Sequence, residues 1–127
     1  MIVIDASVLV GAVLGSDAVL VARLLREPAL HGPELLPLEA GSVLRRFVLG
    51  GQLSERAARG ALAKVEALPL TLHSHRGLLA RIWELRANLT VYDAAYVALA
   101  EALGLPLVTS DSRLSRAPGL RCSVDVV

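Results

Sequence analysis

Two short apolar runs, one at each end of the chain, lead into acidic residues. Residues 1–4 are all apolar and Asp5 follows them directly, while residues 105–108 are apolar and lead into Thr109-Ser110-Asp111. A short unbroken apolar run is typical of a strand that is buried on both faces, as in a parallel sheet covered by helices. Open α/β sheets bind their ligands at the carboxyl ends of such strands. The pattern therefore predicts one acidic pocket that contains Asp5 and Asp111.

Between these two strands the spacing of apolar positions predicts mostly helices. Helices are expected over residues 8–14, about 17–26, from Pro33 or Pro37 to 49, 54–68, about 76–87 and 94–103. Further candidate strands lie at 30–31 and 70–73, and at 121–127 after the second apolar run. A break is expected at Gly32-Pro33. Either proline is tolerated in a first helical turn, so the start of the third helix stays open. This order favours an α/β fold, a three-layer α/β/α sandwich with a mostly parallel central sheet, formed by residues 1–127 as a single domain.

A third acid, Glu39, lies near the start of the helix that follows the two prolines. Spacings of three and four residues place it on one helix face with Leu35, Val43 and Arg46. Glu39 is therefore an acid at the edge of an inward-facing stripe. A first-turn acid favoured by the helix dipole would explain it equally well.

Asp93 is the fourth acid, and it stands at the start of the most apolar helix. Thr90 precedes it by three residues, which is close to the spacing of a capping box, so Asp93 could serve only as a capping residue. Asp5 and Asp111 are harder to explain structurally, because a carboxylate at the end of a buried strand is costly without a partner. A hard divalent cation is the partner that would keep several carboxylates ionised side by side.

Charge and composition narrow the possible partners only slightly. The chain has 13 basic and 12 acidic residues, a balance that argues neither for nor against nucleic acid. All but one of the basic residues are arginines, which suit bidentate contacts with phosphate but also ordinary surface pairing. The candidates for phosphate contact are Arg45, Arg46, Arg113 and Arg116. The one cysteine, Cys122, excludes an internal disulfide and fits a reducing cytoplasm.

The apolar content of 54% is high for a small domain. No run reaches the roughly 18 apolar residues of a membrane-spanning helix, and Asp5 interrupts the only stretch that resembles a signal peptide. We therefore expect no membrane segment, and we expect the surplus apolar surface to form a homodimer or partner interface. The pair His73 and His75 has a zinc-like spacing but no further ligands. Aromatic residues make up 3% of the chain, which argues against base-stacking platforms.

Four short motifs, taken in order, resemble the PIN domain and, within that family, the VapC-like toxins of bacterial toxin–antitoxin pairs. The motifs are Ile4-Asp5-Ala6-Ser7, Leu36-Pro37-Leu38-Glu39-Ala40, Thr90-Val91-Tyr92-Asp93-Ala94-Ala95-Tyr96-Val97-Ala98-Leu99-Ala100 and Thr109-Ser110-Asp111-Ser112-Arg113-Leu114. The resemblance covers essentially the whole chain. Each motif is short, but the four together, in this order and spacing, make the match specific.

The resemblance implies both a site and a reaction. It implies that Asp5, Glu39, Asp93 and Asp111 form an acidic site for Mg²⁺ or Mn²⁺, with Ser7 and Ser110 as supporting polar residues. It further implies metal-dependent cleavage of RNA phosphodiesters and neutralisation by a small antitoxin of the VapB type. If metal offsets the four acids, eight acidic residues remain against 13 basic ones, which leaves a moderately basic surround for a polyanion.

Two other functions remain possible from the residues themselves. Asp5 could be the phosphorylated nucleophile of a phosphotransfer domain. Against this, the usual motif needs a second aspartate where this chain has Ser7, and a receiver-type domain needs a lysine after a late strand, whereas Lys64 is the only lysine. Alternatively, the chain could be a catalytically inactive acidic scaffold that binds a protein or RNA without cutting it.

Overall fold

The computed structural model describes all residues, 1–127, and contains five strands and seven helices. In chain order they are β1 (Ile2–Ile4), α1 (Ala6–Leu14), α2 (Ala18–Arg26), β2 (Leu30–Pro33), α3 (Leu36–Leu49), α4 (Glu55–Ala67), β3 (Leu70–His73), α5 (Leu79–Glu84), α6 (Val91–Leu103), β4 (Leu107–Thr109), α7 (Ser112–Arg116) and β5 (Val124–Val126). All expected helices are present, and the strands include the three minor candidates.

The five strands form one parallel sheet in the order β3-β2-β1-β4-β5. From β1 the chain builds outward on one side through β2 and β3, and it then crosses back to place β4 on the other side of β1. The order of strands therefore reverses between β1 and β4, which is the position where open α/β sheets bind ligands. The predicted α/β fold class and the parallel sheet are confirmed.

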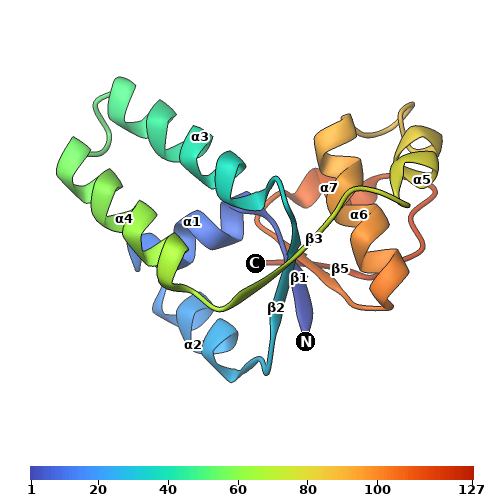
Figure 1. Ribbon diagram of the computed structural model, residues 1–127, viewed down its shortest axis with the longest axis horizontal. Coiled ribbons are helices and arrows are strands. Elements are labelled where there is room, and N and C mark those ends of the chain that lie inside the picture. The colour runs from blue at the N-terminus through green and yellow to red at the C-terminus, as the bar shows by residue number, and fades with distance from the viewer.

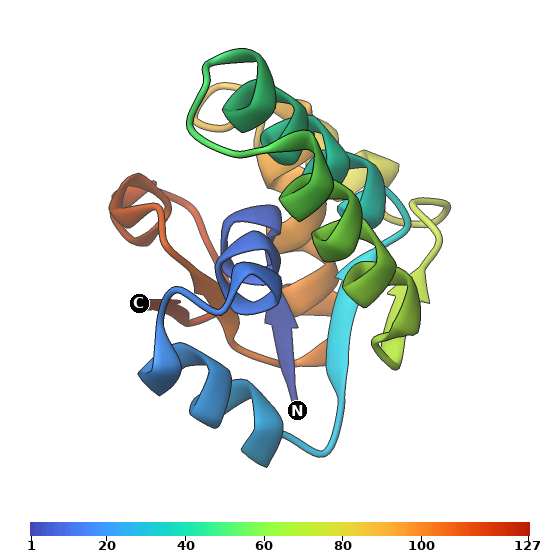
Figure 2. The ribbon, with the colours of Figure 1, turned by 90° about the vertical axis from the view of Figure 1, so that its left-hand side faces the viewer.

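Helices cover both faces of the sheet (Figure 1). One layer contains α1, α2, α3 and α4; Figure 2 looks onto it, with α1 over the centre of the sheet and α3 beside α4. On the opposite face α6 packs against β1, β2 and β4, and α5 packs on α6. No helix is both long and apolar enough to cross a membrane alone, and α1 with α2 would reach that length only as a pair bent by 110°.

Gly32 and Pro33 belong to β2, so the expected break at these residues is wrong. The two residues pair with Leu72 and His73 of β3. Pro33 is tolerated because β1 pairs only with Leu30 and His31, so the missing N–H of Pro33 removes no hydrogen bond to that strand. A β-carbon on Gly32 would clash with the buried side chain of Leu36. The glycine thus lets the start of α3 pack directly on β2, and this close packing sets the position of Glu39.

Two helix boundaries differ from the sequence patterns in informative ways. Helix α3 begins at Leu36 with Pro37 in its first turn, which decides between the two prolines. Helix α5 is shorter than the expected span from 76 to 87. Gly77 adopts φ +84°, a conformation that interrupts a right-handed helix, and Leu78 offers no side-chain cap. The apolar periodicity therefore extends beyond the hydrogen-bonded helix.

Candidate active site

Asp5 lies at the carboxyl end of β1, where it is also the N-cap of α1. Its Oδ1 accepts hydrogen bonds from Ser7 Oγ at 2.6 Å and from the backbone N–H of Val8 at 3.1 Å. Its Oδ2 accepts a hydrogen bond from the Thr109 hydroxyl. Only 9% of Asp5 is exposed. The buried carboxylate is thus held by neutral donors, and one lone pair on Oδ2 remains free for a further ligand.

Ser7 and Thr109 connect the ends of β1 and β4. Besides donating to Asp5, Ser7 Oγ accepts the backbone N–H of Ser110 at 3.1 Å. Thr109 Oγ1 likewise accepts the backbone N–H of Asp111 at 3.0 Å. Each hydroxyl therefore donates to Asp5 and receives from the loop after β4. Together these hydrogen bonds fix the two strand ends at the switch point. Ser110 participates through its backbone N–H.

Asp111 is engaged by the arginine two residues after it. The Arg113 guanidinium donates to both carboxylate oxygens, with Nη2 2.8 Å from Oδ2 and Nε 3.0 Å from Oδ1. The side-chain hydrogen bonds from Arg113 hold the pKa of Asp111 below its ordinary value. Arg113 itself is 82% exposed, and an exposed pair of this kind is easily exchanged for water or another ligand. The pairing therefore stabilises the ionised Asp111 and remains open to competition.

Asp93 lies in the first turn of α6, on the wall of a depression that Asp111 also lines. Its backbone N–H donates to Thr90 Oγ1 at 3.1 Å, so Thr90 is the cap and the Asp93 carboxylate stays available. Burial raises the pKa of Asp93, and the carboxylates of Asp111 and Asp5 raise it further. The Thr90 hydroxyl lowers it in part. Asp93 is thus a carboxylate whose ionised form lacks full compensation.

Glu39 reaches the same region from α3, on the other helical layer. Burial raises its pKa, the Tyr96 hydroxyl lowers it, and Asp93 and Asp5 raise it again. Tyr96 is only 2% exposed, and its hydroxyl is buried without a hydrogen-bond partner of ordinary geometry. Burial and the nearby Glu39 carboxylate raise the pKa of Tyr96 strongly, so the phenol stays protonated. An unpaired buried hydroxyl beside two carboxylates is a natural place for an ordered water or a hydrated ion.

The four predicted acids therefore surround the switch point from four different segments. The mutual effects on their pKa values place Asp5 within electrostatic range of both Glu39 and Asp93, and Asp93 within range of Asp111. No three acidic, histidine or cysteine side chains lie close enough to hold a metal ion directly. Mg²⁺, however, usually keeps several waters and takes only one or two carboxylates from the protein. The donor set of carboxylates and hydroxyls fits such a hydrated hard cation.

The four arginines proposed for phosphate contact differ in their surroundings. Arg45, Arg46 and Arg116 are exposed and take part in no ion pair, whereas Arg113 is paired with Asp111. Arg46 shares a depression with Glu39 and lowers the pKa of that carboxylate. Among these four, Arg46 and Arg113 therefore lie beside the acidic site.

Sequence patterns did not indicate three further residues of the site. Thr109 and Tyr96 read as an ordinary strand residue and an ordinary core residue, yet they contact or adjoin the carboxylates. Tyr92 is 63% exposed and lines the depression beside Glu39. For Tyr92 a usable signal existed, because it directly precedes Asp93 at the start of a helix whose next seven residues, Ala94 to Ala100, are all apolar.

Comparison with known proteins identifies the family of this chain. The signature of the PIN domain family matches residues 2–120. Ribonuclease VapC1 of Mycobacterium tuberculosis is 46% identical over 132 residues, covering 98% of this chain and 96% of the relative. Ribonuclease VapC9 of the same species is 43% identical over 127 residues, covering 100% and 98%.

A solved structure shares the fold at low sequence identity. VapBC2 from Rickettsia felis, solved bound to a DNA fragment from its promoter, superposes with a TM-score of 0.74 at 13% identity, covering 100% of this chain and 99% of that one. This likeness supports the fold, while the family signature and the curated relatives carry the assignment. The chain belongs to the PIN domain family, and within that family it groups with the VapC proteins.

Proposed function

We propose that this protein is an endoribonuclease that uses Mg²⁺ or Mn²⁺ and acts as the toxin of a toxin–antitoxin pair. The observation that carries the proposal is the convergence of Asp5, Glu39, Asp93 and Asp111 at the switch point of a parallel sheet. Burial and like charge raise the pKa values of Glu39 and Asp93, so both carboxylates would gain from a cation. The names of the curated VapC relatives support RNA as the substrate class.

The chain's own residues divide the work of the reaction. A bound divalent cation supplies an acidified water and stabilises charge on the attacked phosphate. Asp5, fixed by Ser7 and Thr109, and Asp93, capped in place by Thr90, would hold that cation. Glu39 faces the same space from α3 and can orient water or take its proton. The Tyr96 hydroxyl stays protonated beside Glu39 and can donate a hydrogen bond to it.

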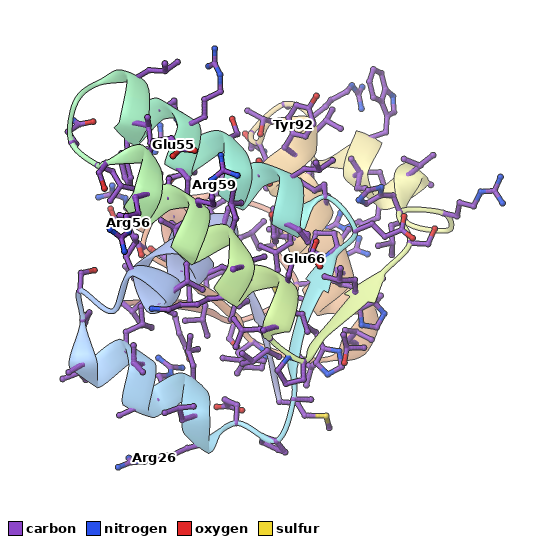
Figure 3. All side chains as sticks on the ribbon, turned by 60° about the vertical axis from the view of Figure 1, so that its left-hand side comes forward. Arg26, Glu55, Arg56, Arg59, Glu66 and Tyr92 are labelled. Carbon is purple, nitrogen blue, oxygen red and sulfur yellow. The ribbon has the colours of Figure 1, made fainter.

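The test uses total cellular RNA, because a narrow substrate preference could escape a generic oligonucleotide. Purified protein is incubated with RNA and Mn²⁺, with and without EDTA, and new 5′ ends are mapped. We expect discrete cleavage sites that disappear with EDTA and in the Asp93→Asn variant. The matched control is Glu66→Gln, which removes an exposed carboxylate on the outer helix α4 (Figure 3) and should cleave as the wild type does.

Two outcomes would point to the other functions. Identical 5′ ends from wild type and Asp93→Asn, with both proteins folded and free of partners, would favour a catalytically inactive scaffold. A phosphoryl group on Asp5, detected by mass spectrometry after incubation with a phosphodonor, would favour a phosphotransfer domain. Cleavage that survives EDTA would contradict the proposed dependence on a metal.

The proposed partner is a small antitoxin of the VapB type, in line with the VapBC complex among the structural neighbours. An apolar hollow of about 300 Å³ lies between α1, α2 and α4, and apolar side chains line it except for Lys64. Val19 and Leu25 of α2 are about four-fifths exposed, and Leu25 lines the hollow. We expect an apolar segment of the antitoxin to bind there, because apolar surface of this kind is costly in water.

The change Leu25→Asp tests this interface. It should abolish co-purification with the product of a neighbouring antitoxin gene while metal-dependent cleavage persists. Leu49→Asp, at an exposed apolar position at the end of α3, is the control and should retain binding. Sedimentation of the partner-free protein tests the proposed homodimer, and a dimer that dissociates only in Leu25→Asp would assign the hollow to a second copy instead. A cytoplasmic location follows from the proposal, since cellular RNA is its substrate.

A further inference from the structure

Tyr92 of α6 and Arg46 of α3 line one depression beside the carboxylates. The depression has a volume of about 380 Å³ and lies between the first turn of α6 and the exposed face of α3. Figure 3 shows Tyr92 at the start of α6, next to α3. Glu39 also lines the depression, and Asp93 follows Tyr92 directly in the chain. Any group bound in this space therefore lies against two of the four acids.

Neither wall residue has a structural role that explains its position. The Tyr92 side chain is 63% exposed and its hydroxyl takes part in no hydrogen bond. Arg46 is exposed and pairs with no carboxylate at salt-bridge distance, unlike Arg23, Arg59, Arg81 and Arg113, which all do. An exposed aromatic ring and an unpaired guanidinium are the two groups that proteins use to hold a single-stranded nucleotide, by stacking on the base and by contact with the phosphate.

We propose that this depression is a subsite for one unpaired nucleotide of the RNA substrate, with its base stacked on Tyr92 and a phosphate held by Arg46. The proposal rests on the nuclease function and adds the substrate contact next to the cut. Leu35 and Leu38 give the depression apolar lining that suits a base, and Ser42 offers a hydroxyl for the edge of that base. A single ring cannot serve as a platform for a run of bases. It can impose the requirement that the nucleotide beside the cut be unpaired.

The charges that line the depression favour RNA over a protein segment as its ligand. The depression contains one carboxylate and one guanidinium, and Glu39 would be neutralised by a cation during the reaction, which leaves Arg46 as the net positive group. A phosphate one nucleotide away from the scissile bond must lie close to the catalytic carboxylates, and Arg46 lines the same depression as Glu39. An antitoxin side chain remains the competing occupant, and the experiment separates the two.

The first experiment measures RNA binding without cleavage. Fluorescein-labelled single-stranded RNA of mixed sequence is titrated at low salt with Ca²⁺ in place of Mn²⁺, so that a cation is present beside Glu39, and binding is followed by anisotropy while a denaturing gel confirms that the RNA stays intact. A stacked base contributes about 1–3 kcal/mol, so Tyr92→Ala should weaken binding about 5- to 150-fold. Tyr92→Phe keeps the ring and should bind within about twofold of the wild type. Trp83→Ala removes a ring of equal exposure (62%) on α5, outside the depression, and should have no effect.

The second experiment tests the phosphate contact with a pair of adjacent arginines. Arg46→Gln should weaken binding and reduce the slope of log affinity against log salt by about one unit. Arg45→Gln changes an equally exposed arginine that does not line the depression, and its smaller effect sets the baseline. A loss of the same size from both variants would mean a diffuse basic surface and would overturn the assignment of Arg46.

Abasic substitution identifies the stacked position and separates the two proposals. An abasic nucleotide should weaken wild-type binding at one position and have no further effect in Tyr92→Ala, because the two changes remove the same contact. If wild type cleaves in a metal- and Asp93-dependent manner while Tyr92→Ala keeps both affinity and KM, the subsite is wrong and the nuclease stands. If Tyr92→Ala loses antitoxin binding and keeps RNA affinity, the depression belongs to the antitoxin. Circular dichroism confirms folding of each variant.

Discussion

The two sides of the candidate site are built in opposite ways. On the sheet side, Asp5 is held by hydrogen bonds from Ser7, Thr109 and the α1 backbone, and these hydrogen bonds connect it to the loop after β4. On the helix side, Glu39 and Asp93 project from α3 and α6 with raised pKa values and incomplete compensation. The difference indicates a division of roles. The sheet side holds the Asp5 carboxylate in place, whereas the ionised carboxylates on the helix side destabilise the free protein and are stabilised when a cation binds.

Replacing Thr109 with valine should remove the hydrogen bonds that hold the sheet side, and it should lower both stability and cleavage. Valine keeps the shape but leaves Asp5 Oδ2 without its donor and the Asp111 N–H without its acceptor. We expect a loss of about 1–3 kcal/mol in the free energy of unfolding, because the groups left behind are buried. Cleavage should fall about 10- to 100-fold, since positioning of a metal ligand is lost. Urea denaturation and RNA cleavage measure the two effects, and Thr109→Ser should recover most of the activity.

Gly32→Ala should disturb the helix side through packing alone. The added methyl group meets the Cδ2, Cγ and Cβ atoms of the buried Leu36 side chain, so that side chain must repack against the first turn of α3 and can displace it. A destabilisation of about 1–3 kcal/mol is expected for overpacking of this kind, together with lower activity because Glu39 moves with the turn. Thermal unfolding and cleavage are the measurements. Gly60→Ala, on α4 with no atom within contact distance of an added methyl group, is the control and should be neutral or slightly stabilising.

Asp93→Asn should raise stability while it removes activity. The ionised Asp93 is disfavoured by burial and by neighbouring carboxylates, so its native pKa lies above the unfolded value of about 3.9. Between the unfolded and the native pKa of Asp93, the native state binds more protons than the unfolded state. The stability of the wild type therefore falls as the pH rises through this range. We expect the variant to melt a few degrees higher at pH 7 in EDTA. The higher stability of the variant should disappear below about pH 3.9, where Asp93 is protonated in both states. A lower melting temperature of the variant at pH 7 would contradict repulsion between Asp93 and the neighbouring carboxylates.

Protonation of His31 should lower stability at acidic pH by a smaller amount than the carboxylates change it, and the two contributions must be measured separately. Its Nδ1 lies 2.9 Å from His73 Nε2, and burial with the neighbouring His73 lowers its pKa. The unfolded chain binds more protons below about pH 6.5, so stability should fall as the pH drops through that value. His31→Gln should flatten the stability curve between about pH 7 and 5 and leave the carboxylate region unchanged. Chemical denaturation across this range is the measurement.

The sequence was sufficient for features that depend on near neighbours. The strand before Asp5 and the Thr90 cap of α6 follow from short patterns, and the structure confirms both of them. The proximity of Asp5 and Asp111 could be expected because parallel strands bring their carboxyl ends to one edge, and Asp93 joined them only through the resemblance to the PIN family. The resemblance to the PIN family added Glu39, whose position on α3 alone would also suit an ordinary first-turn acid.

Features that depend on distant segments could not be predicted. Thr109 donates to a carboxylate 104 residues earlier in the chain, and no local pattern records such a contact. The continuation of β2 through Gly32 and Pro33 was missed because both residues usually end strands, and here pairing with β3 outweighs that tendency. The ion pair between Arg113 and Asp111 could not be predicted either, since the same arginine could equally have faced solvent or phosphate.

The capping of α6 by Thr90 also bears on how the gene would change under selection. Because Thr90 and not Asp93 satisfies the helix start, the acid can be replaced without disturbing the fold. In a cell that loses its antitoxin, survivors should therefore carry full-length alleles altered at residue 93 as well as truncations. Such alleles would still produce a folded chain that binds antitoxin and competes for it with any intact copy.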